Sequence, residues 1–220
     1  AMLVTDEDGE PQSVHGVILD ITERRAAYEL QQLTTDLLEL FVRKSSRLEY
    51  LDSVAKLIRS WCGCQCVGLR VLEEETRRIP YHAYQGFPED LWLKENDLLL
   101  DGTCACSRVL TGETEPQDEP LLTEGGSFAC PNAPEFLKTL DEEARGRFRG
   151  ECVRHGMKTV VIVPVRYRGR PIGAVHIADP HAYCVSAKKV EHLESVAPLI
   201  GEAIYRFSME EKLAESNALL

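Results

Sequence analysis

Apolar residues recur at alternating steps of four and three near both ends of the chain. The N-terminal set is Ala26, Leu30, Leu33, Leu37 and Leu40, and the C-terminal set is Leu193, Val196, Ile200, Ala203 and Phe207. This spacing places each set along one side of a helix, as in the a and d positions of a coiled coil. It predicts long helices at 23–44 and, after the N-cap Ser186, up to 217. We expect a parallel homodimer formed through both helices.

Between these helices the pattern alternates between the helical period and the two-residue period of strands. It predicts first a helix at 48–61 and strands at 64–72 and 79–84. A helix at 141–155 follows, with Asp141 as its N-cap and Gly156 as its stop. The last two strands are predicted at 159–167 and 171–178, joined by a tight turn at Arg168-Gly169. This order predicts an α+β fold, in which an antiparallel sheet has helices packed on one side and long helices flank it at both ends.

The connection at 86–134 is rich in Gly, Pro, Asp and Glu, and shows only one short helical pattern, at 106–110. Connections this long inside a compact domain are usually functional or disordered. The aromatic and cysteine residues in this one favour function. We therefore expect a ligand or cofactor to bind between the sheet and the segment 86–152.

The N-terminal segment reads as a strand at 14–21 that follows the turn signal Asp8-Gly9-Glu10-Pro11. Asp20 and Thr22 can each cap the helix that follows. The abrupt opening at Ala1-Met2 leads us to expect that the natural protein extends further in both directions.

Composition excludes two classes of function. A net charge of −11 argues against a nucleic-acid partner, because phosphate binding needs clustered Lys and Arg. No apolar stretch approaches the roughly 18–20 residues of a membrane span, so we expect no membrane insertion in this fragment. The eight cysteines come without a signal peptide, which predicts free thiols and a cytoplasmic location.

Four cysteines form the sharpest candidate site. Cys104, Cys106, Cys130 and Cys152 all fall in or beside the long connection, and four thiolates can close a tetrahedral zinc or iron–sulfur site. The alternative is that they are small buried thiols in a pocket wall. Three other cysteines, at positions 62, 64 and 66, begin a strand, and we expect them to be structural.

The ligand-binding candidates are aromatic residues together with thiols and a histidine. They are Tyr84, Trp92, Cys104, Cys106, Phe128 and His176. Aromatic walls with a few polar groups are typical of small-molecule cavities, and His176 can hydrogen-bond a ligand or bind haem iron. Core packing explains the aromatic residues equally well. No catalytic motif is present, so we expect no enzymatic activity.

Two family resemblances emerge from short strings. The string G-V-I-L-D-I-T-E-R-R at 16–25 resembles the last strand and exit motif of a PAS domain. The strings S-V-A-K-L-I at 53–58 and V-I-V-P-V-R-Y-R-G-R-P-I-G-A-V-H-I-A-D at 161–179 resemble a GAF domain. In the second string Pro164 suits a strand edge, and Gly173 permits close backbone approach. The division this implies is a PAS remnant at 1–22, a helical linker at 23–45, a GAF domain at 46–207 and an output linker at 208–220.

A narrower resemblance involves D-G-T-C-A-C-S-R-V-L-T-G-E-T-E-P, T-E-G-G-S-F and R-G-E-C-V-R-H-G-M-K-T-V. These strings are similar to GAF domains of prokaryotic PAS–GAF sensor histidine kinases, some of which attach haem through cysteine. The resemblance implies a sensory domain that passes a conformational signal through helices to an output domain. The alternatives are a thiol-based metal, haem or redox sensor, a ligand-free dimerisation module, and a GAF-fold methionine sulfoxide reductase.

Overall fold

The computed structural model describes residues 2–5, 8, 10–15 and 19–218. They fall into two compact units, which divide between Gln32 and Leu33. In the first unit β1 (Met2–Thr5) pairs antiparallel with β2 (Pro11–His15). None of the described helices is long and apolar enough to cross a membrane.

The strand predicted at 14–21 is correct only in its first two residues. Residues 16–18 lie outside the described residues, and 19–21 form no regular structure. The reason is the start of α1 (Thr22–Arg43), where the Asp20 carboxylate accepts a hydrogen bond of 2.9 Å from the Thr22 backbone N–H. An extended chain must end where such a cap turns the backbone into a helix.

The second unit contains the remaining elements. They are α2 (Arg47–Cys62), β3 (Cys66–Val71), β4 (Tyr81–Gln85), α3 (Glu89–Glu95), α4 (Ala105–Thr111), the 3₁₀ helix η1 (Pro116–Leu121), β5 (Phe128–Cys130), α5 (Ala133–Thr139), α6 (Glu142–Gly146), α7 (Glu151–Arg154), β6 (Thr159–Tyr167), β7 (Arg170–Asp179) and α8 (Ala187–Ala218). We call the segment between β4 and β6, residues 86–158, the crossover.

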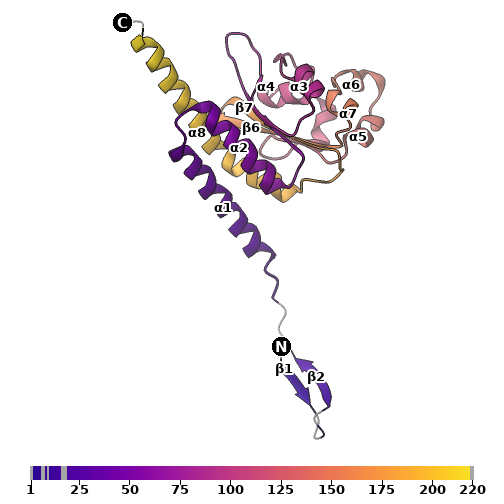
Figure 1. Cartoon of the computed structure of the whole chain (residues 1–220). Helices are drawn as coiled ribbons and strands as arrows, with labels where there is room; N and C mark the ends of the chain where they lie inside the picture. The colour runs from indigo at the N-terminus through magenta and orange to yellow at the C-terminus, as the bar shows by residue number, and fades with distance from the viewer. Residues whose placement is uncertain (1, 6–7, 9, 16–18, 219–220) are drawn as a thin grey trace. The chain divides into compact units, whose positions relative to one another are not determined.

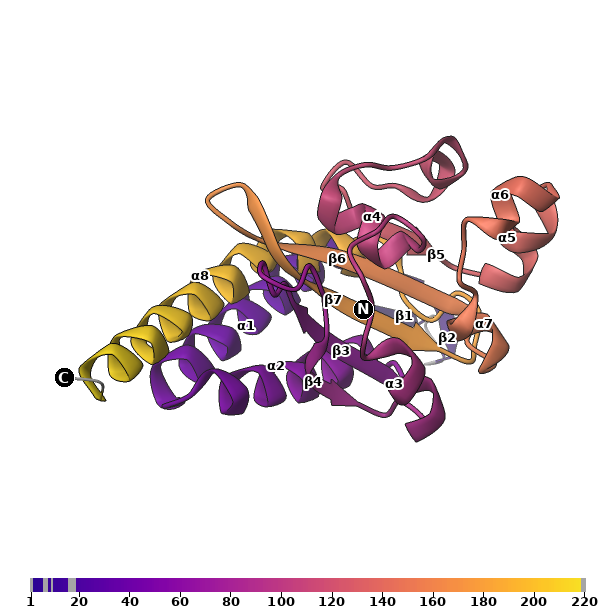
Figure 2. The same ribbon diagram turned by 90° about the horizontal axis from the view of Figure 1, so that it is seen from above.

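Five strands form one antiparallel sheet in the order β4-β3-β7-β6-β5. Helices α2 and α8 cover one face, and the crossover with its short helices covers the other (Figures 1 and 2). The α+β class with an antiparallel sheet and long terminal helices is therefore confirmed. Because side chains alternate along a strand, Val160 and Ile162 face the crossover, whereas Val161 and Val163 face the helices.

The second predicted hairpin is confirmed almost residue for residue. Pro164 lies in a part of β6 that has no paired strand on the β5 side, because β5 pairs only with residues 160–162. Gly173 of β7 lies against β3, and a Cβ atom built on it would be 2.3 Å from the backbone oxygen of Arg70. This close approach is the one that the sequence predicts for a glycine.

The prediction of one continuous helix at 141–155 is wrong. The Asp141 side chain does accept a hydrogen bond of 2.8 Å from the Ala144 N–H, as an N-cap. However, Gly150 has a φ of +69°, which lies in the left-handed region and interrupts the helix. The result is two short helices, α6 and α7, with Phe148 between them.

The predicted coiled-coil seam is partly used within the chain itself. Leu33 and Leu37 of α1 are fully buried, and so is the whole predicted set of α8 (Leu193, Val196, Ile200, Ala203 and Phe207), so these side chains are not free to pair with a second copy. At the end of α1, Phe41 packs edge-on against Tyr50 of α2 and Phe207 of α8, with ring centroids 6.1 and 6.0 Å away. The heptad pattern therefore reflects intramolecular packing as well as any dimer.

Candidate functional site

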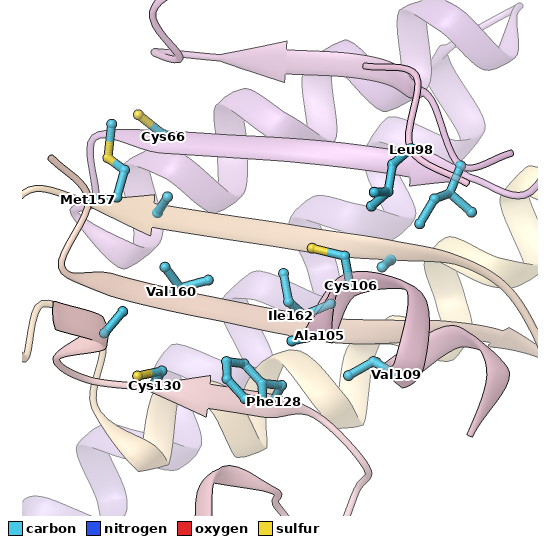
Figure 3. Packing of buried hydrophobic residues seen from close by; sticks show 14 of the residues in the cluster. Cys66, Leu98, Ala105, Cys106, Val109, Phe128, Cys130, Met157, Val160 and Ile162 are labelled. Atoms are coloured by element: carbon cyan, nitrogen blue, oxygen red, sulfur yellow. The ribbon is translucent and has the colours of Figure 1, made fainter. Parts of the chain in front are cut away.

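A cavity of about 50 Å³ lies between the sheet and the crossover. Figure 3 shows the core around it, with Ala105 and Cys106 of α4 above β6, and Phe128 and Cys130 on the adjacent β5. The lining residues are Glu95, Cys104, Ala105, Cys106, Phe128, Cys130, Ala133, Phe136, Leu137, Phe148, Gly150, Glu151, Cys152, Val153, Val160 and Ile162. The volume holds roughly three or four water molecules. It is well below the roughly 300–1,000 Å³ of typical ligand pockets, so a larger ligand requires the crossover to move.

The four predicted cysteines all line this cavity. A hydrogen bond from the Cys106 thiol lowers the pKa of Cys104 to about 7, and the same pairing, together with burial, raises the pKa of Cys106. Burial also raises the pKa of Cys130 to about 11 and raises the pKa of Cys152. Cys104 is therefore the thiol of this group with substantial thiolate character at neutral pH.

A buried charged network lies beside the cavity. The Arg70 guanidinium is fully buried, and it donates hydrogen bonds to the Ile79 oxygen at 2.7 Å and to the Glu95 backbone oxygen at 2.9 Å. It also donates to the Glu95 carboxylate at 3.3 Å and lies 3.7 Å from the centroid of the Tyr81 ring. A buried arginine needs such partners because an uncompensated charge in the core is costly.

His176 extends this network to the cavity wall. Its Nδ1 lies 2.6 Å from the Tyr81 hydroxyl, and its Nε2 lies 3.8 Å from the Cys152 sulfur. Burial and the nearby Arg70 charge lower the pKa of His176 to about 3. The imidazole is therefore neutral at physiological pH, and the thiol beside it has a raised pKa. The Cys152–His176 contact is a neutral pair, unlike the thiolate–imidazolium pair of a cysteine nucleophile.

Two carboxylate oxygens at the cavity lack hydrogen bonds. Glu95 Oε1 is buried and accepts none, although it lies 3.4 Å from an Arg149 nitrogen. Glu151 Oε2 is also buried without a hydrogen bond, at 3.7 Å from Lys94 Nζ and from His155 Nδ1. Buried polar atoms in native proteins are normally satisfied, so these oxygens are positions where a ligand or water can donate.

A second buried ion pair holds α4 over the cavity. Arg108 Nε and Nη2 donate to the two carboxylate oxygens of Asp118 at 2.6 and 2.8 Å. Arg108 Nη1 also donates to the backbone oxygens of Gly102 and Arg147, each at 2.8 Å. One side chain thus ties together α4, η1 and the loop before α7. This fixes Cys106 of α4, and Cys104 directly before the helix, above the sheet.

Three of the predicted ligand-binding residues do not line the cavity. Tyr84 is 41% exposed and stacks on Trp92 with ring centroids 5.3 Å apart. His176 lies behind Cys152 rather than in the lining. The predicted Cys104, Cys106 and Phe128 do line it.

Sequence reasoning missed the two glutamates at the cavity and the network behind it. A signal was available for the network, because Arg70 interrupts the apolar run of β3 (C-V-G-L-R-V) and so predicts a buried charge with a partner. Nothing in the sequence marks Glu95 as that partner, because surface helices also contain many glutamates.

The metal and haem predictions fit these residues poorly. Among the described residues, no three or more His, Cys, Asp or Glu side chains are grouped closely enough to hold a metal ion. The four cavity cysteines therefore do not form a zinc or iron–sulfur site as they lie. A haem is far larger than the cavity, and both ring nitrogens of His176 face protein partners.

Sequence comparison identifies the family. The profile of the GAF domain matches residues 46–204, which is most of the chain. This chain belongs to the GAF domain family. GAF domains typically serve as small-molecule-binding regulatory modules, and the fold also occurs in enzymes. No curated protein matches the sequence.

Solved structures support the same fold. The GAF domain of an Acinetobacter phosphoenolpyruvate-protein phosphotransferase has a TM-score of 0.62 at 14% identity, over 86% of this chain and 98% of that one. The free methionine-R-sulfoxide reductase of Neisseria meningitidis, in complex with its substrate, has a TM-score of 0.63 at 13% identity, over 90% and 98%. A domain of a protein named as a two-component sensor histidine kinase from Sinorhizobium meliloti has a TM-score of 0.52 at 13% identity, over 78% and 99%.

Proposed function

We propose that this GAF domain is the sensory part of a cytoplasmic signal-transduction protein and binds a small ligand in the cavity between sheet and crossover. The observation that carries the proposal is Glu95 Oε1, a buried carboxylate oxygen at a largely apolar cavity, which accepts no hydrogen bond although an Arg149 nitrogen lies 3.4 Å away. A ligand with an apolar body and one donor group, such as a primary amine, would satisfy it.

The fold offers a route from this ligand to the terminal helices. Glu95 pairs with Arg70 of β3, and the network continues through Tyr81 to His176 of β7. On the opposite face, α8 packs so closely on β6 that a Cβ on Gly201 would be 2.2 Å from the Arg166 oxygen. A ligand that moves the crossover over β6 would therefore alter how α8 packs on the other face of the sheet. This change would bias an attached output domain such as a histidine kinase.

A thermal-shift screen tests ligand binding. The probes are the free amino acids with apolar side chains and the alkylamines that share those side chains. A compound present at 100 times its Kd would stabilise the fold by about 2.7 kcal/mol. For a protein of this size, that corresponds to a rise in Tm of about 5–10 °C.

Matched variants distinguish cavity binding from surface binding. Glu95→Gln removes the charge that the amine needs, and Ala133→Leu fills the cavity. Both should abolish the shift, whereas Ala187→Leu on the exposed first turn of α8 should retain it. If no probe stabilises the wild-type chain, or if all three variants respond alike, the proposed binding site is wrong.

We also propose that the domain acts as a parallel homodimer through its long helices. Apolar side chains remain exposed on both, namely Leu38 and Val42 of α1 and Met209 and Leu213 of α8. Light scattering at high concentration should report a dimer, and Val42→Lys combined with Leu213→Lys should reduce it to a monomer. A wild-type monomer under these conditions would contradict the dimer.

One enzymatic alternative has an observation in its favour. Cys104, with its lowered pKa, shares a cavity with Cys152, and free methionine-R-sulfoxide reductases are among the similar structures. Incubation of the reduced chain with free methionine-R-sulfoxide, followed by quantification of methionine, tests this directly. The sensory proposal expects no turnover. Turnover that disappears in Cys104→Ser would instead make the chain an enzyme.

A further inference from the structure

A positively charged side chain lies beside the carboxylate oxygen that the proposed function assigns to the ligand. Arg149, in the loop between α6 and α7, has its Nη2 atom 3.4 Å from Glu95 Oε1 and makes no hydrogen bond to that oxygen. The same Nη2 atom donates a hydrogen bond of 2.9 Å to the backbone oxygen of Lys94. A ligand ammonium group on Glu95 Oε1 would therefore lie next to the Arg149 guanidinium.

The two arginines beside Glu95 are held very differently. The Arg70 side chain is 0% exposed, and it is fixed by hydrogen bonds to the Ile79 and Glu95 backbone oxygens and to the Glu95 carboxylate. The Arg149 side chain is 30% exposed and lies in a loop. Burying a charge is costly, whereas a partly exposed ion pair contributes little to stability. Arg70 is therefore the fixed counter-ion of Glu95, and Arg149 is the one that can move into water.

Repulsion between like charges governs how a cationic ligand can bind here. An ammonium group on Glu95 Oε1 would lie close to Arg149, in a largely buried site where the repulsion between two positive charges is strong. Displacement of the Arg149 guanidinium into water removes this repulsion. Glu95 then still has two cations beside it, namely Arg70 and the ligand ammonium, so the net charge at the site is unchanged. A cationic ligand therefore binds best when it exchanges with Arg149.

The loop that contains Arg149 is also part of the cavity wall. Its two chain neighbours, Phe148 and Gly150, both line the cavity. The contacts of Arg149 with Lys94 and Glu95 tie this loop to α3. When Arg149 leaves Glu95, the tie is weakened, and Phe148 and Gly150 are no longer held against α3. The exchange would thus supply the crossover movement that a ligand larger than the cavity requires.

We propose that Arg149 determines the selectivity of this site, and that a small primary amine binds Glu95 by displacing the Arg149 guanidinium into solvent. This role rests on the ligand site proposed above and identifies the side chain that competes for it. Arg149 would weaken the binding of amines and spare neutral molecules of the same shape. If Arg149 blocks the site in about nine-tenths of the molecules, the apparent Kd of an amine is about tenfold higher than its intrinsic value.

A comparison of two probes on two chains tests the exchange. Isobutylamine and isobutanol have the same shape, but only the amine is charged at neutral pH. Their Kd values are measured by NMR titration of the wild-type chain and of Arg149→Gln. The Kd of isobutylamine should fall about tenfold in Arg149→Gln, whereas isobutanol should bind both chains alike. Arg147→Gln is the matched control in the same loop, because the Arg147 guanidinium pairs with Glu115 at 3.1 Å, and it should leave both Kd values unchanged.

A double variant shows whether Arg149 acts through Glu95. In the Glu95→Gln background, Arg149→Gln should not improve the binding of isobutylamine, because the charge for which the two cations compete is absent. Circular dichroism of each variant verifies its fold.

Two results would overturn the exchange and leave the ligand site intact. Isobutylamine would bind the wild-type chain and Arg149→Gln equally well, or isobutanol would gain as much affinity as isobutylamine, which would mean that the variant merely opens the cavity. If isobutylamine binds neither chain, the ligand site and the exchange are both wrong.

Discussion

The buried pair of Arg108 and Asp118 offers the most direct test of how the crossover is held. The two side chains are 1% and 2% exposed and share two short hydrogen bonds. Asp118→Ala leaves the guanidinium buried without its counter-ion, which typically costs about 3–5 kcal/mol. Domains are stable by only about 5–15 kcal/mol, so this is a large share of the total.

The expected effect on Tm follows from the size of the chain. At about 2–4 °C per kcal/mol for domains of this length, Asp118→Ala should lower Tm by about 6–20 °C. Urea unfolding followed by circular dichroism gives the free energy directly. A matched control is Glu74→Ala, which removes the carboxylate of an ion pair whose side chains are 72% and 81% exposed. It should change the stability by no more than about 0.5 kcal/mol.

A double variant separates the charge from the packing. Replacing both partners by apolar residues, as in Arg108→Met with Asp118→Leu, removes the uncompensated charge and should recover much of the loss. The reasoning is refuted if Asp118→Ala costs less than about 1 kcal/mol, or if the double variant is as unstable as Asp118→Ala alone.

Three further predictions concern single residues. Because the pKa of His176 is lowered from 6.5 to about 3, the unfolded chain binds this proton in that window and the folded chain does not. Stability should therefore fall between pH 6.5 and 5 by about 2 kcal/mol more in the wild type than in His176→Gln, as measured by urea unfolding. The rate of Cys104 alkylation by iodoacetamide should be half-maximal near pH 7. Cys106→Ala should move that midpoint to higher pH, because the hydrogen bond from Cys106 is the main cause of the lowered pKa of Cys104. An unchanged midpoint would mean that Cys106 does not cause the lowered pKa. Gly173→Ala should destabilise the sheet in thermal unfolding because of its clash with the Arg70 oxygen, whereas Gly146→Ala, which meets nothing within 4 Å, should be neutral or stabilising.

Local chemistry in the sequence determined most of the elements and the family. The alternating pattern of β6 and β7, the turn at Arg168-Gly169, and the cap at Asp141 all depend on near neighbours, and all agree with the structure. The class of fold follows from the order of these elements. The break at Gly150 was missed because a glycine within a helical pattern does not reveal the sign of its φ.

Only the tertiary structure decided which residues meet. The four cavity cysteines were identifiable as a group because they cluster in one connection, but Glu95 and Phe148 join them only through the folding of the crossover. From the sequence, Tyr84 and Trp92 are as suitable as Phe128 for an aromatic cavity wall, yet they stack on each other outside the cavity.

The sequence also did not determine which groups the other thiols and the long helices contact. In the sequence Cys62 and Cys64 differ little from Cys66, but Gly63 ends α2 directly after Cys62, whereas Cys66 lies in β3 and its thiol hydrogen-bonds the Gly86 oxygen at 3.1 Å. The heptads of α1 specified an apolar stripe without specifying its partner, and Leu33 and Leu37 are buried within the chain. Periodicity fixes the side of a helix that is buried, whereas the choice of what covers it depends on contacts between residues far apart in sequence.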